Sequence, residues 1–324
     1  MDTNSTDRYD FLAIGEVLVD LIASDPGTSL AEATTLHRYA GGQATNLARN
    51  MALLGNRVAL SACVGDDGFG RFLRQQVGNS GVDISNLQTS QRTPTTLVCV
   101  TKTPGGTPEF LVYRGADAQL APTLDLKSAV KQSRIVHTSA FALACNPSRD
   151  TILECLHLAH QAGKIISLDP NYHERIWSDI PDFINTLQAA FALVDVAKPS
   201  LDDCHRLFGP GESPQQYSER FLSWGASTVV LTMGSEGVFV ATRSGERIYL
   251  PSHPVMVMDV TGAGDAFWAG LLTGLLHGLP AIDAARAGQV LAEVKIGSVG
   301  PMTHAIDFEA IKAQVQSFEY PTQP

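Results

Sequence analysis

Apolar and polar residues alternate in segments of strand and helix length along most of the chain. The apolar run FLAIGEVLVDLIA at 11–23 predicts an opening strand. Helically spaced apolar residues in TNLARNMALLG at 45–55 predict a helix that Gly55 terminates, and RVALSACVG at 57–65 predicts a second strand.

The next two apolar runs, at 95–101 and 109–114, flank the Pro- and Gly-rich stretch KTPGGTP and predict a hairpin in a small sheet outside the main one. From residue 130 the alternation is regular. Further strands are predicted at 133–143, 164–171, 190–200, 227–234, 237–242 and 255–258. Helices are predicted at 148–163 with Ser148 as N-cap, at 265–278 and at 280–296. This order predicts an α/β fold with a mostly parallel sheet, which binds ligands at the C-terminal ends of its strands.

Composition narrows the function classes. With 324 residues, of which 44% are hydrophobic, the chain can bury one large α/β core with an appendage, or two domains. The formal charge of −10 disfavours binding to nucleic acid or to an anionic membrane. Five cysteines without a CxxC pair indicate a reducing, cytoplasmic location, and we expect no signal peptide and no membrane span.

The stretch DVTGAGDAFWAG at 259–270 carries the clearest chemical signal. Gly262, Ala263 and Gly264 precede an apolar helix, so free N–H groups and the helix dipole form an anion site there. Asp265 is either a helix-terminal acid worth up to about 1 kcal/mol or a general base beside a transferring phosphoryl group. A dinucleotide fingerprint, and with it a dehydrogenase, is disfavoured because Phe267 replaces the third glycine.

The same stretch resembles the C-terminal signature of the ribokinase-like (PfkB) carbohydrate kinases, and residues 40–70 resemble their N-terminal signature. The resemblance implies an ATP-dependent kinase with a Rossmann-like α/β/α sandwich and a small β-sheet lid. It implies a single domain over 9–320, with lid segments at about 17–40 and 92–118 and a flexible tail at 1–8. In this family the acid of the GAGD turn is the catalytic base, which assigns that role to Asp265 and the anion hole to 262–264.

Sugar-binding residues follow from the same resemblance. They are Asp20, Gly41, Gly42, Asn46, Arg114 and Asn171. From the residues alone, Asp20 remains open as a turn acid, Asn46 as a helix-start amide and Asn171 as a strand-end turn. LDPNYHERIW at 168–177 resembles a stretch of fructokinase-like and 2-keto-3-deoxygluconate kinase-like members, but His173 stands where many of them carry arginine, which weakens the case for an acidic sugar.

The resemblance also implies the nucleotide and cation contacts. The nucleotide contacts are Lys198, Ser200, Thr232, Gly234 and Gly237, with a β-turn as the plain alternative for the last three. Ser200 and Asp203 replace the family's Asn and Glu, and Asp203 is expected to reach Mg²⁺ indirectly through water. Asp259 and Thr261 match a K⁺ site, although 296–303 does not match its usual partner segment, so K⁺ stays open.

We expect an enzyme that moves the γ-phosphoryl group of ATP, with Mg²⁺, to a primary hydroxyl of fructose or a related ketose. The alternatives are 2-keto-3-deoxygluconate, ribose or a nucleoside as substrate, or a sugar-binding protein without catalysis. The expected partners are the sugar, ATP and a second copy of the chain joined through the lid, since the open edges of a lid sheet need cover.

Overall fold

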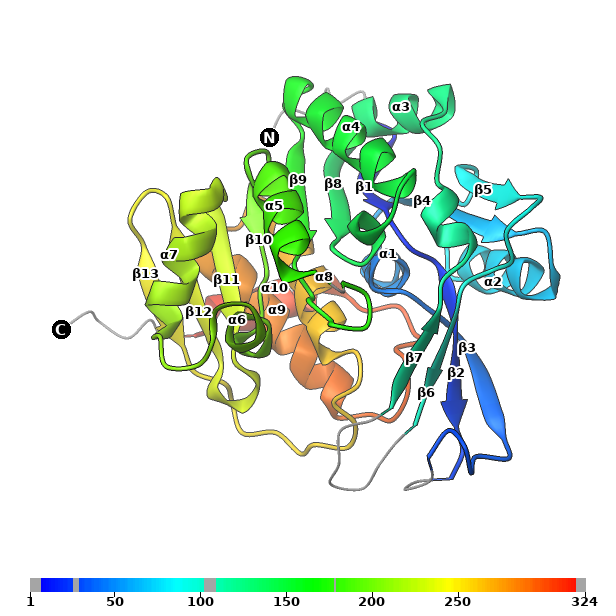
Figure 1. Cartoon of the computed structure of the whole chain (residues 1–324). Helices are drawn as coiled ribbons and strands as arrows, with labels where there is room; N and C mark the ends of the chain where they lie inside the picture. Colours follow the sequence, from blue (N-terminus) through cyan, green and yellow to red (C-terminus); the bar gives the residue numbers. More distant parts are fainter. Residues whose placement is uncertain (1–6, 26–28, 102–108, 178, 319–324) are drawn as a thin grey trace.

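Two β-sheets of unequal size organise the chain, and a computed structural model describes residues 7–25, 29–101, 109–177 and 179–318 (Figure 1). The large sheet has the order β13-β12-β11-β10-β9-β8-β1-β4-β5, parallel from β11 to β5, with β12 and β13 added antiparallel. Its strands are β1 (Tyr9–Ile14), β4 (Val58–Gly65), β5 (Leu87–Ser90), β8 (Ser133–Ser139), β9 (Ile165–Asp169), β10 (Val196–Ala197), β11 (Thr228–Thr232), β12 (Val238–Thr242) and β13 (Arg247–Leu250). The predicted α/β class is confirmed.

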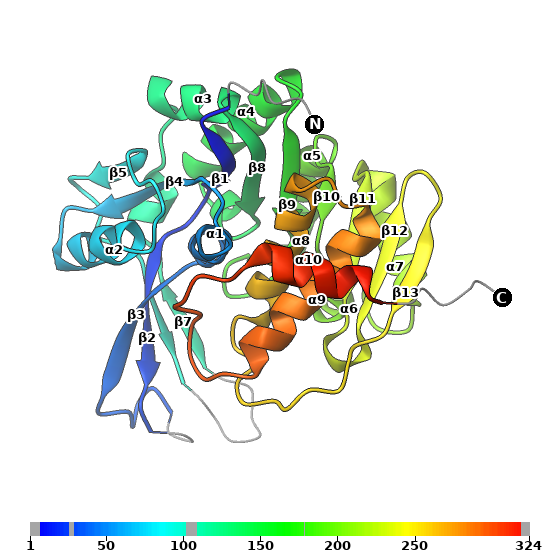
Figure 2. The same cartoon turned by 180° about the vertical axis from the view of Figure 1, so that it is seen from behind.

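Helices cover both faces of this sheet. One layer contains α1 (Gln43–Leu53), α2 (Gly68–Gly78), α8 (Ala263–Leu276), α9 (Ala281–Ile296) and α10 (Phe308–Gln316), which face the viewer in Figure 2. The other contains α3 (Leu124–Lys131), α4 (Ser148–Gln161), α5 (Ile180–Phe191), α6 (Leu201–Phe208) and α7 (Pro214–Trp224). Each layer has its own apolar core, one around Leu47 and Trp268 and the other around Leu156 and Phe183. The sheet is therefore buried on both faces, as a parallel sheet requires.

The small sheet projects from one end of this body (Figures 1 and 2). Its order is β3-β2-β6-β7, formed by β3 (Leu36–Gly41), β2 (Leu18–Ala23), β6 (Leu97–Val100) and β7 (Phe110–Tyr113). Strands β6 and β7 pair antiparallel, so the predicted hairpin is confirmed, while most of its connecting loop, 102–108, lies outside the described residues. We call these four strands the lid sheet.

The opening strand predicted at 11–23 is wrong as a single element. It divides into β1 in the large sheet and β2 in the lid sheet, with Gly15 between them. A Cβ atom on Gly15 would lie 2.7 Å from the Cβ of Ala44, so glycine lets α1 pack against the chain where it changes sheets. Asp20 consequently belongs to the lid sheet and not to the end of the first large-sheet strand.

Three local predictions also fail. The run VMVM at 255–258 forms no strand, and Met256 is 83% exposed. The predicted strand at 190–200 is largely absent, because residues 190–191 complete α5 and 192–193 form a turn. The helix continues to Phe191 because Phe183, Leu187 and Phe191 lie on one buried face of it. Ser148 is the first residue of α4, and the N-cap is Pro147. An apolar run alone cannot distinguish a buried strand from a helix end or an exposed segment.

Ion pairs hold the first residues that the structure describes. Residues 1–6 of the predicted tail lie outside the described residues, whereas Asp7 and Arg8 form ion pairs with Lys164 and Asp83. All five cysteines are free thiols. Within the described part of the chain, every helix is too short or too polar to cross a bilayer.

Candidate active site

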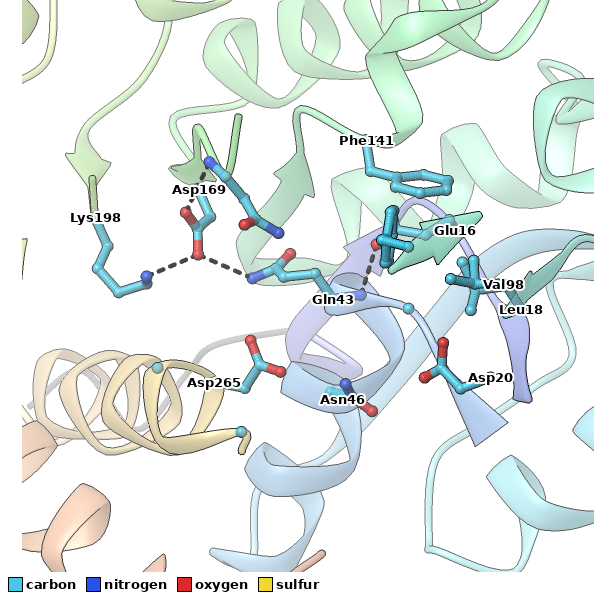
Figure 3. Close-up of a pocket in the computed structure, with 15 residues that line it drawn as sticks. Glu16, Leu18, Asp20, Gln43, Asn46, Val98, Phe141, Asp169, Lys198 and Asp265 are labelled. Carbon is cyan, nitrogen blue, oxygen red and sulfur yellow. Dashed lines mark hydrogen bonds and ion pairs between the residues drawn. The ribbon is translucent and has the colours of Figure 1, made fainter. Parts of the chain in front are cut away.

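A pocket of about 330 Å³ lies between the lid sheet and the start of α8, and Figure 3 shows its side chains. The predicted site residues that line it are Asp20, Gly42, Asn46, Asn171, Lys198, Gly262, Gly264 and Asp265. Lining residues to which the sequence assigned no role are Glu16, Leu18, Gln43, Val98, Phe110, Phe141 and Asp169. The two signature motifs, more than 200 positions apart, thus contribute to one cavity.

The N-terminus of α8 forms one wall of the pocket. Its N-cap, Gly262, adopts the left-handed conformation with φ 78° and offers no side-chain cap. Of the anion hole predicted at 262–264, the Ala263 N–H already donates to the carbonyl of Val260 at 3.1 Å, whereas the N–H groups of Gly264 and Asp265 in the first turn of α8 are placed to meet an anion. The helix therefore presents an uncapped positive end to the pocket.

Asp265 has an unusual protonation equilibrium. Burial and the nearby charge of Asp169 raise its pKa to about 7, while the charge of Lys198 and a hydrogen bond from Asn46 oppose that rise. A carboxyl group with a pKa near neutrality can accept a proton from an attacking hydroxyl and release it again to solvent. In Figure 3, Asp265 lies between Lys198 and Asn46 at the first turn of α8.

Lys198 is the cation among the described residues that line the pocket. Its Nζ lies 2.9 Å from Oδ2 of Asp169, and both side chains are almost fully buried. Burial alone would lower the pKa of Lys198, but Asp169, Asp203 and Asp265 together raise it. A Cβ atom added to Gly264 would lie 3.9 Å from that Nζ, so the ammonium sits beside the α8 N-terminus and reinforces its anion site.

A hydrogen-bonded network that the sequence did not reveal supports the floor of the pocket. Glu16 accepts hydrogen bonds from Ser139 Oγ and from the Gln43 N–H, both at 2.6 Å. The Gln43 side chain donates to Asp169 Oδ2 at 3.4 Å, which extends the network to Lys198. Glu16 and Gln43 lie within the motifs IGEVLVD and GGQATN, but the sequence gives no sign that they contact each other. Their hydrogen bonds to Ser139 of β8 and Asp169 of β9 depend on the three-dimensional fold.

Asp20 faces the pocket from the lid sheet. Burial and the charge of Glu16 raise its pKa to about 7. A Cβ atom on Gly41 would overlap the carboxylate of Asp20 at 1.9 Å, so Gly41 is required to leave room for that side chain. Gly41 thus shapes the site without lining it. An acid held in this way is suited to accept hydrogen bonds from neighbouring hydroxyl groups of a ligand.

Comparison with known proteins agrees with this geometry. The model of the family described as pfkB family carbohydrate kinase matches residues 10–307. The chain belongs to the pfkB family of carbohydrate kinases. It is therefore an ATP-dependent phosphotransferase with an alcohol group as acceptor.

Several relatives of this carbohydrate kinase are similar over nearly their whole length. An ATP-dependent 6-phosphofructokinase of Thermoanaerobacterium thermosaccharolyticum is 34% identical over 306 residues, which covers 94% of each chain. A fructokinase of Klebsiella pneumoniae is 34% identical over 277 residues, or 85% of this chain and 87% of the relative. The solved structure of Halothermothrix orenii fructokinase matches with a TM-score of 0.77 and 33% identity, covering 91% of this chain and 99% of the other.

Two further predicted sugar contacts differ in position. Asn171 lines the pocket with a positive φ of 31°, and its N–H donates to Asp169 Oδ1 at 3.2 Å. Arg114 does not line the pocket. Its guanidinium donates to Asp117 at 2.7 Å and to the carbonyl of Phe141 at 2.9 Å, and it stacks on the Phe141 ring. Arg114 thereby supports a pocket residue, and a direct sugar contact stays a prediction.

The residues expected to bind the nucleotide lie outside this pocket, apart from Lys198. Thr232 ends β11 beside Ser200, and Gly234 begins a short 3-10 turn, Gly234–Glu236. Gly237 has φ 103°, and a Cβ atom there would lie 2.2 Å from the carbonyl oxygen of Leu250. Its requirement for glycine is therefore explained by packing, and contact with a nucleotide stays a prediction.

Asp203, the residue expected to reach Mg²⁺, is engaged within the protein. Its Oδ2 accepts from Ser200 Oγ at 2.6 Å and from the Ser200 N–H at 3.1 Å, and its Oδ1 accepts from the Tyr172 N–H at 2.9 Å. Among the described residues, no three His, Cys, Asp or Glu side chains could jointly hold a metal. These residues do not fit a direct divalent-metal site, whereas Mg²⁺ held by ATP phosphates and water needs few protein ligands.

Asp259 and Thr261, expected to bind K⁺, lie before the α8 turn and outside the pocket. The Thr261 N–H donates to Asp259 Oδ1 at 3.0 Å. The carbonyl oxygen of Asp259 accepts a hydrogen bond from Lys295 Nζ at 3.2 Å, so an ammonium group lies beside these residues. The position therefore does not fit K⁺ as the resemblance implies.

Proposed function

We propose that this carbohydrate kinase phosphorylates a primary hydroxyl of a neutral ketose, with fructose as the first candidate. The observation that carries the proposal is the arrangement of Asp265, beside the uncapped N-terminus of α8, opposite Asp20 on the lid sheet in one cavity. Asp20 binds ring hydroxyls, and Asn46 hydrogen-bonds to Asp265 from α1. This arrangement directs one hydroxyl of the sugar toward the base.

In the proposed reaction, Asp265 accepts the proton of the attacking sugar hydroxyl while the hydroxyl oxygen forms a bond to the γ-phosphorus. The bond between the γ-phosphorus and the bridging oxygen breaks, and ADP leaves. The α8 N–H groups and the Lys198 ammonium stabilise the negative charge on the transferring phosphoryl group. Mg²⁺ carried by ATP would neutralise part of the phosphate charge.

Charge within the pocket supports a neutral substrate. Four carboxyl groups line it, those of Glu16, Asp20, Asp169 and Asp265, whose raised pKa values reflect their burial and repulsion by neighbouring carboxylates, and the cation among the described lining residues, Lys198, is paired with Asp169. An anionic sugar would meet unfavourable charge there unless a cation lies near its acidic group. This argument ranks fructose above 2-keto-3-deoxygluconate, while ribose and nucleosides remain neutral alternatives.

Fructose 6-phosphate is a second candidate, because a relative 34% identical over 94% of the chain is named ATP-dependent 6-phosphofructokinase. Its phosphate would extend from the pocket toward the lid sheet. Arg38, on β3, does not face the pocket, because the strand register pairs it with Leu21 on the face of the lid sheet opposite Asp20, where its guanidinium stacks 4.4 Å from the centre of the Phe72 ring.

The test measures ADP release with Mg²⁺ for fructose, fructose 6-phosphate, 2-keto-3-deoxygluconate, ribose, adenosine and glucose. Asp265→Asn is compared with Asp150→Asn, because Asp150 also lies in the first turn of a helix, α4. We expect fructose to give the highest kcat/KM, Asp265→Asn to lose at least about a hundredfold, and Asp150→Asn to remain active. Sugar binding without ADP release would instead favour a non-catalytic protein.

We also propose that the lid sheet joins two copies of the chain. The strand register places Leu36, Leu111 and Tyr113 on the face of the lid sheet opposite Asp20. Leu36 and Leu111 are each 39% exposed and Tyr113 is 57% exposed. Apolar side chains on a sheet face with open edges favour association with a second such sheet.

A further inference from the structure

The ammonium group of Lys295 lies at the position where the family resemblance implies K⁺. Lys295 belongs to the last turn of α9 and is 3% exposed. Its Nζ donates to the carbonyl oxygens of Asp259 at 3.2 Å and Ser298 at 3.4 Å, and lies 3.9 Å from Asp259 Oδ2. Carbonyl and carboxylate oxygens near a helix C-terminus favour a cation, and here the chain supplies that cation itself.

The same contacts fix the backbone that leads into the α8 turn. The carbonyl of Ile296 accepts from the N–H groups of Met258 at 2.8 Å and Asp259 at 3.3 Å. The Gly300 N–H donates to Asp259 Oδ2 at 3.1 Å. The end of α9 and the residues after it are therefore tied to the segment that precedes the anion site.

Lys295 also lies directly beside the turn. A Cβ atom on Gly262 would be 3.9 Å from Lys295 Cε, so the aliphatic part of the lysine packs against the residue that caps α8. Thr261 is held by Asp259, whose carbonyl Lys295 binds. One chain of contacts thus runs from the ammonium to the N–H groups that face the pocket.

The oxygen atoms around the Lys295 ammonium already accept hydrogen bonds from this chain. Asp259 Oδ1 accepts from the Thr261 N–H at 3.0 Å, and Asp259 Oδ2 accepts from the Gly300 N–H at 3.1 Å. A K⁺ ion bound to the same carbonyl oxygens would lie within a few ångströms of the ammonium, where like charges repel strongly.

We propose that Lys295 replaces a monovalent cation, so that the kinase works without K⁺ and Lys295 acts as a positioning residue for the α8 anion site. The inference rests on the proposed kinase reaction, because it concerns the turn that carries Asp265. Lys295 touches neither the pocket nor the reacting atoms, and acts through Asp259 and the backbone of the turn.

The first test compares activity in K⁺-free buffer containing tetramethylammonium with activity after K⁺ is added. Wild-type kcat should be the same in both, a result that needs no variant. Lys295→Met should lose about tenfold to a hundredfold in kcat without K⁺, because the turn is misplaced, and should recover with K⁺ but not with the larger tetramethylammonium ion. Lys312→Met, on α10 with a surface ion pair to Glu309, is the matched control and should behave as wild type.

Three outcomes would overturn the proposal. They are activation of the wild type by K⁺, full activity of Lys295→Met without K⁺, and a loss in Lys295→Met that K⁺ does not restore. The last would show that Lys295 serves packing alone.

A second test needs no sugar. The melting temperature of Lys295→Met should rise with K⁺ and not with tetramethylammonium, because an ion that binds the folded state stabilises it, whereas the wild type should not respond. If no sugar supports turnover, the proposed function fails, but this measurement still decides whether Lys295 fills a cation site. An unchanged melting temperature for the variant in K⁺ would count against the inference.

Discussion

The carboxyl group of Asp265 has a pKa suited to its proposed role, and this gives a pH prediction. With a pKa of about 7, only the ionised fraction can accept the proton of the sugar hydroxyl. We expect kcat/KM for the sugar to fall at least about tenfold per pH unit below that pKa, since Asp20 also has a pKa of about 7, and to level off above it. Steady-state rates at saturating ATP between about pH 5 and pH 9 check this, and a flat profile with rate-limiting chemistry would contradict it.

The same pKa predicts an effect on stability. The pKa of Asp265 is raised from 3.8 to about 7 by folding, so the folded state binds the proton more tightly. Its contribution to stability is then present at low pH and is lost as pH rises through about 7. Asp265→Asn, which cannot ionise, should raise the free energy of unfolding at pH 8 by up to about 4 kcal/mol. Near pH 4, where Asp265 is protonated in the folded state, the substitution should leave the free energy of unfolding almost unchanged. Urea unfolding of the wild type, Asp265→Asn and the control Asp150→Asn at both pH values tests this difference.

Sequence reasoning located the site residues that lie inside contiguous motifs. Asp265 and Asn46 could be assigned because each motif combines local helix chemistry with a recognisable pattern. Glu16 and Phe141 could not, since their places in the pocket depend on contacts across the fold, such as Glu16 with Ser139 and Phe141 with Arg114. Single residues next to a motif carry no such signal.

At the scale of the elements, the two residues at the N-terminus of α6 that depart from the family pattern, Ser200 and Asp203, stabilise the start of the helix. Ser200 and Asp203 form a capping box, in which each side chain accepts the backbone N–H of the other. Ser200→Ala should lower the free energy of unfolding by about 1 kcal/mol, and Ser200→Thr, which keeps the cap, by less. Chemical denaturation measures both.

The KM for ATP distinguishes this role from nucleotide binding. If Ser200 acts only as the cap, KM for ATP should change little in Ser200→Ala. A large increase in KM for ATP with unchanged stability would show that the hydroxyl binds the nucleotide, as the family resemblance implies.

The four helices predicted from the sequence are present within two residues of their predicted bounds, but α2, α3, α5, α6, α7 and α10 were not predicted. The helix now seen as α8 was correctly placed because its glycine turn and apolar length agree. The segment 255–258 is also apolar, but β13 is already the edge strand of the large sheet. The Met258 N–H donates to the carbonyl of Ile296 at the end of α9, and the segment pairs with no strand in the described part of the chain. Whether an apolar run finds a strand partner is decided by the rest of the fold, and local pattern does not contain that information.

At the scale of the whole molecule, the lid sheet contributes to the pocket and carries the face that we propose joins two copies of the chain. It contributes Asp20, Val98 and Phe110 to the pocket on one face and exposes Leu111 and Tyr113 on the other. The hairpin followed from the local pattern, whereas the lid segment at about 17–40 followed only from the family resemblance, because the opening apolar run by itself predicts one continuous strand. A change on the outer face can therefore reach the sugar site through one layer of backbone.

We expect the wild type to sediment as a dimer and Leu111→Glu/Tyr113→Glu to sediment as a monomer, because two charges on that face oppose its burial. Tyr249→Glu, at an exposed tyrosine of β13 in the large sheet, is the control and should remain dimeric. The monomer should show a higher KM for the sugar with little change in KM for ATP, since the lid carries Asp20 and α8 does not belong to it. Analytical ultracentrifugation and steady-state kinetics on the same samples test both parts, and a monomeric wild type would refute the lid interface.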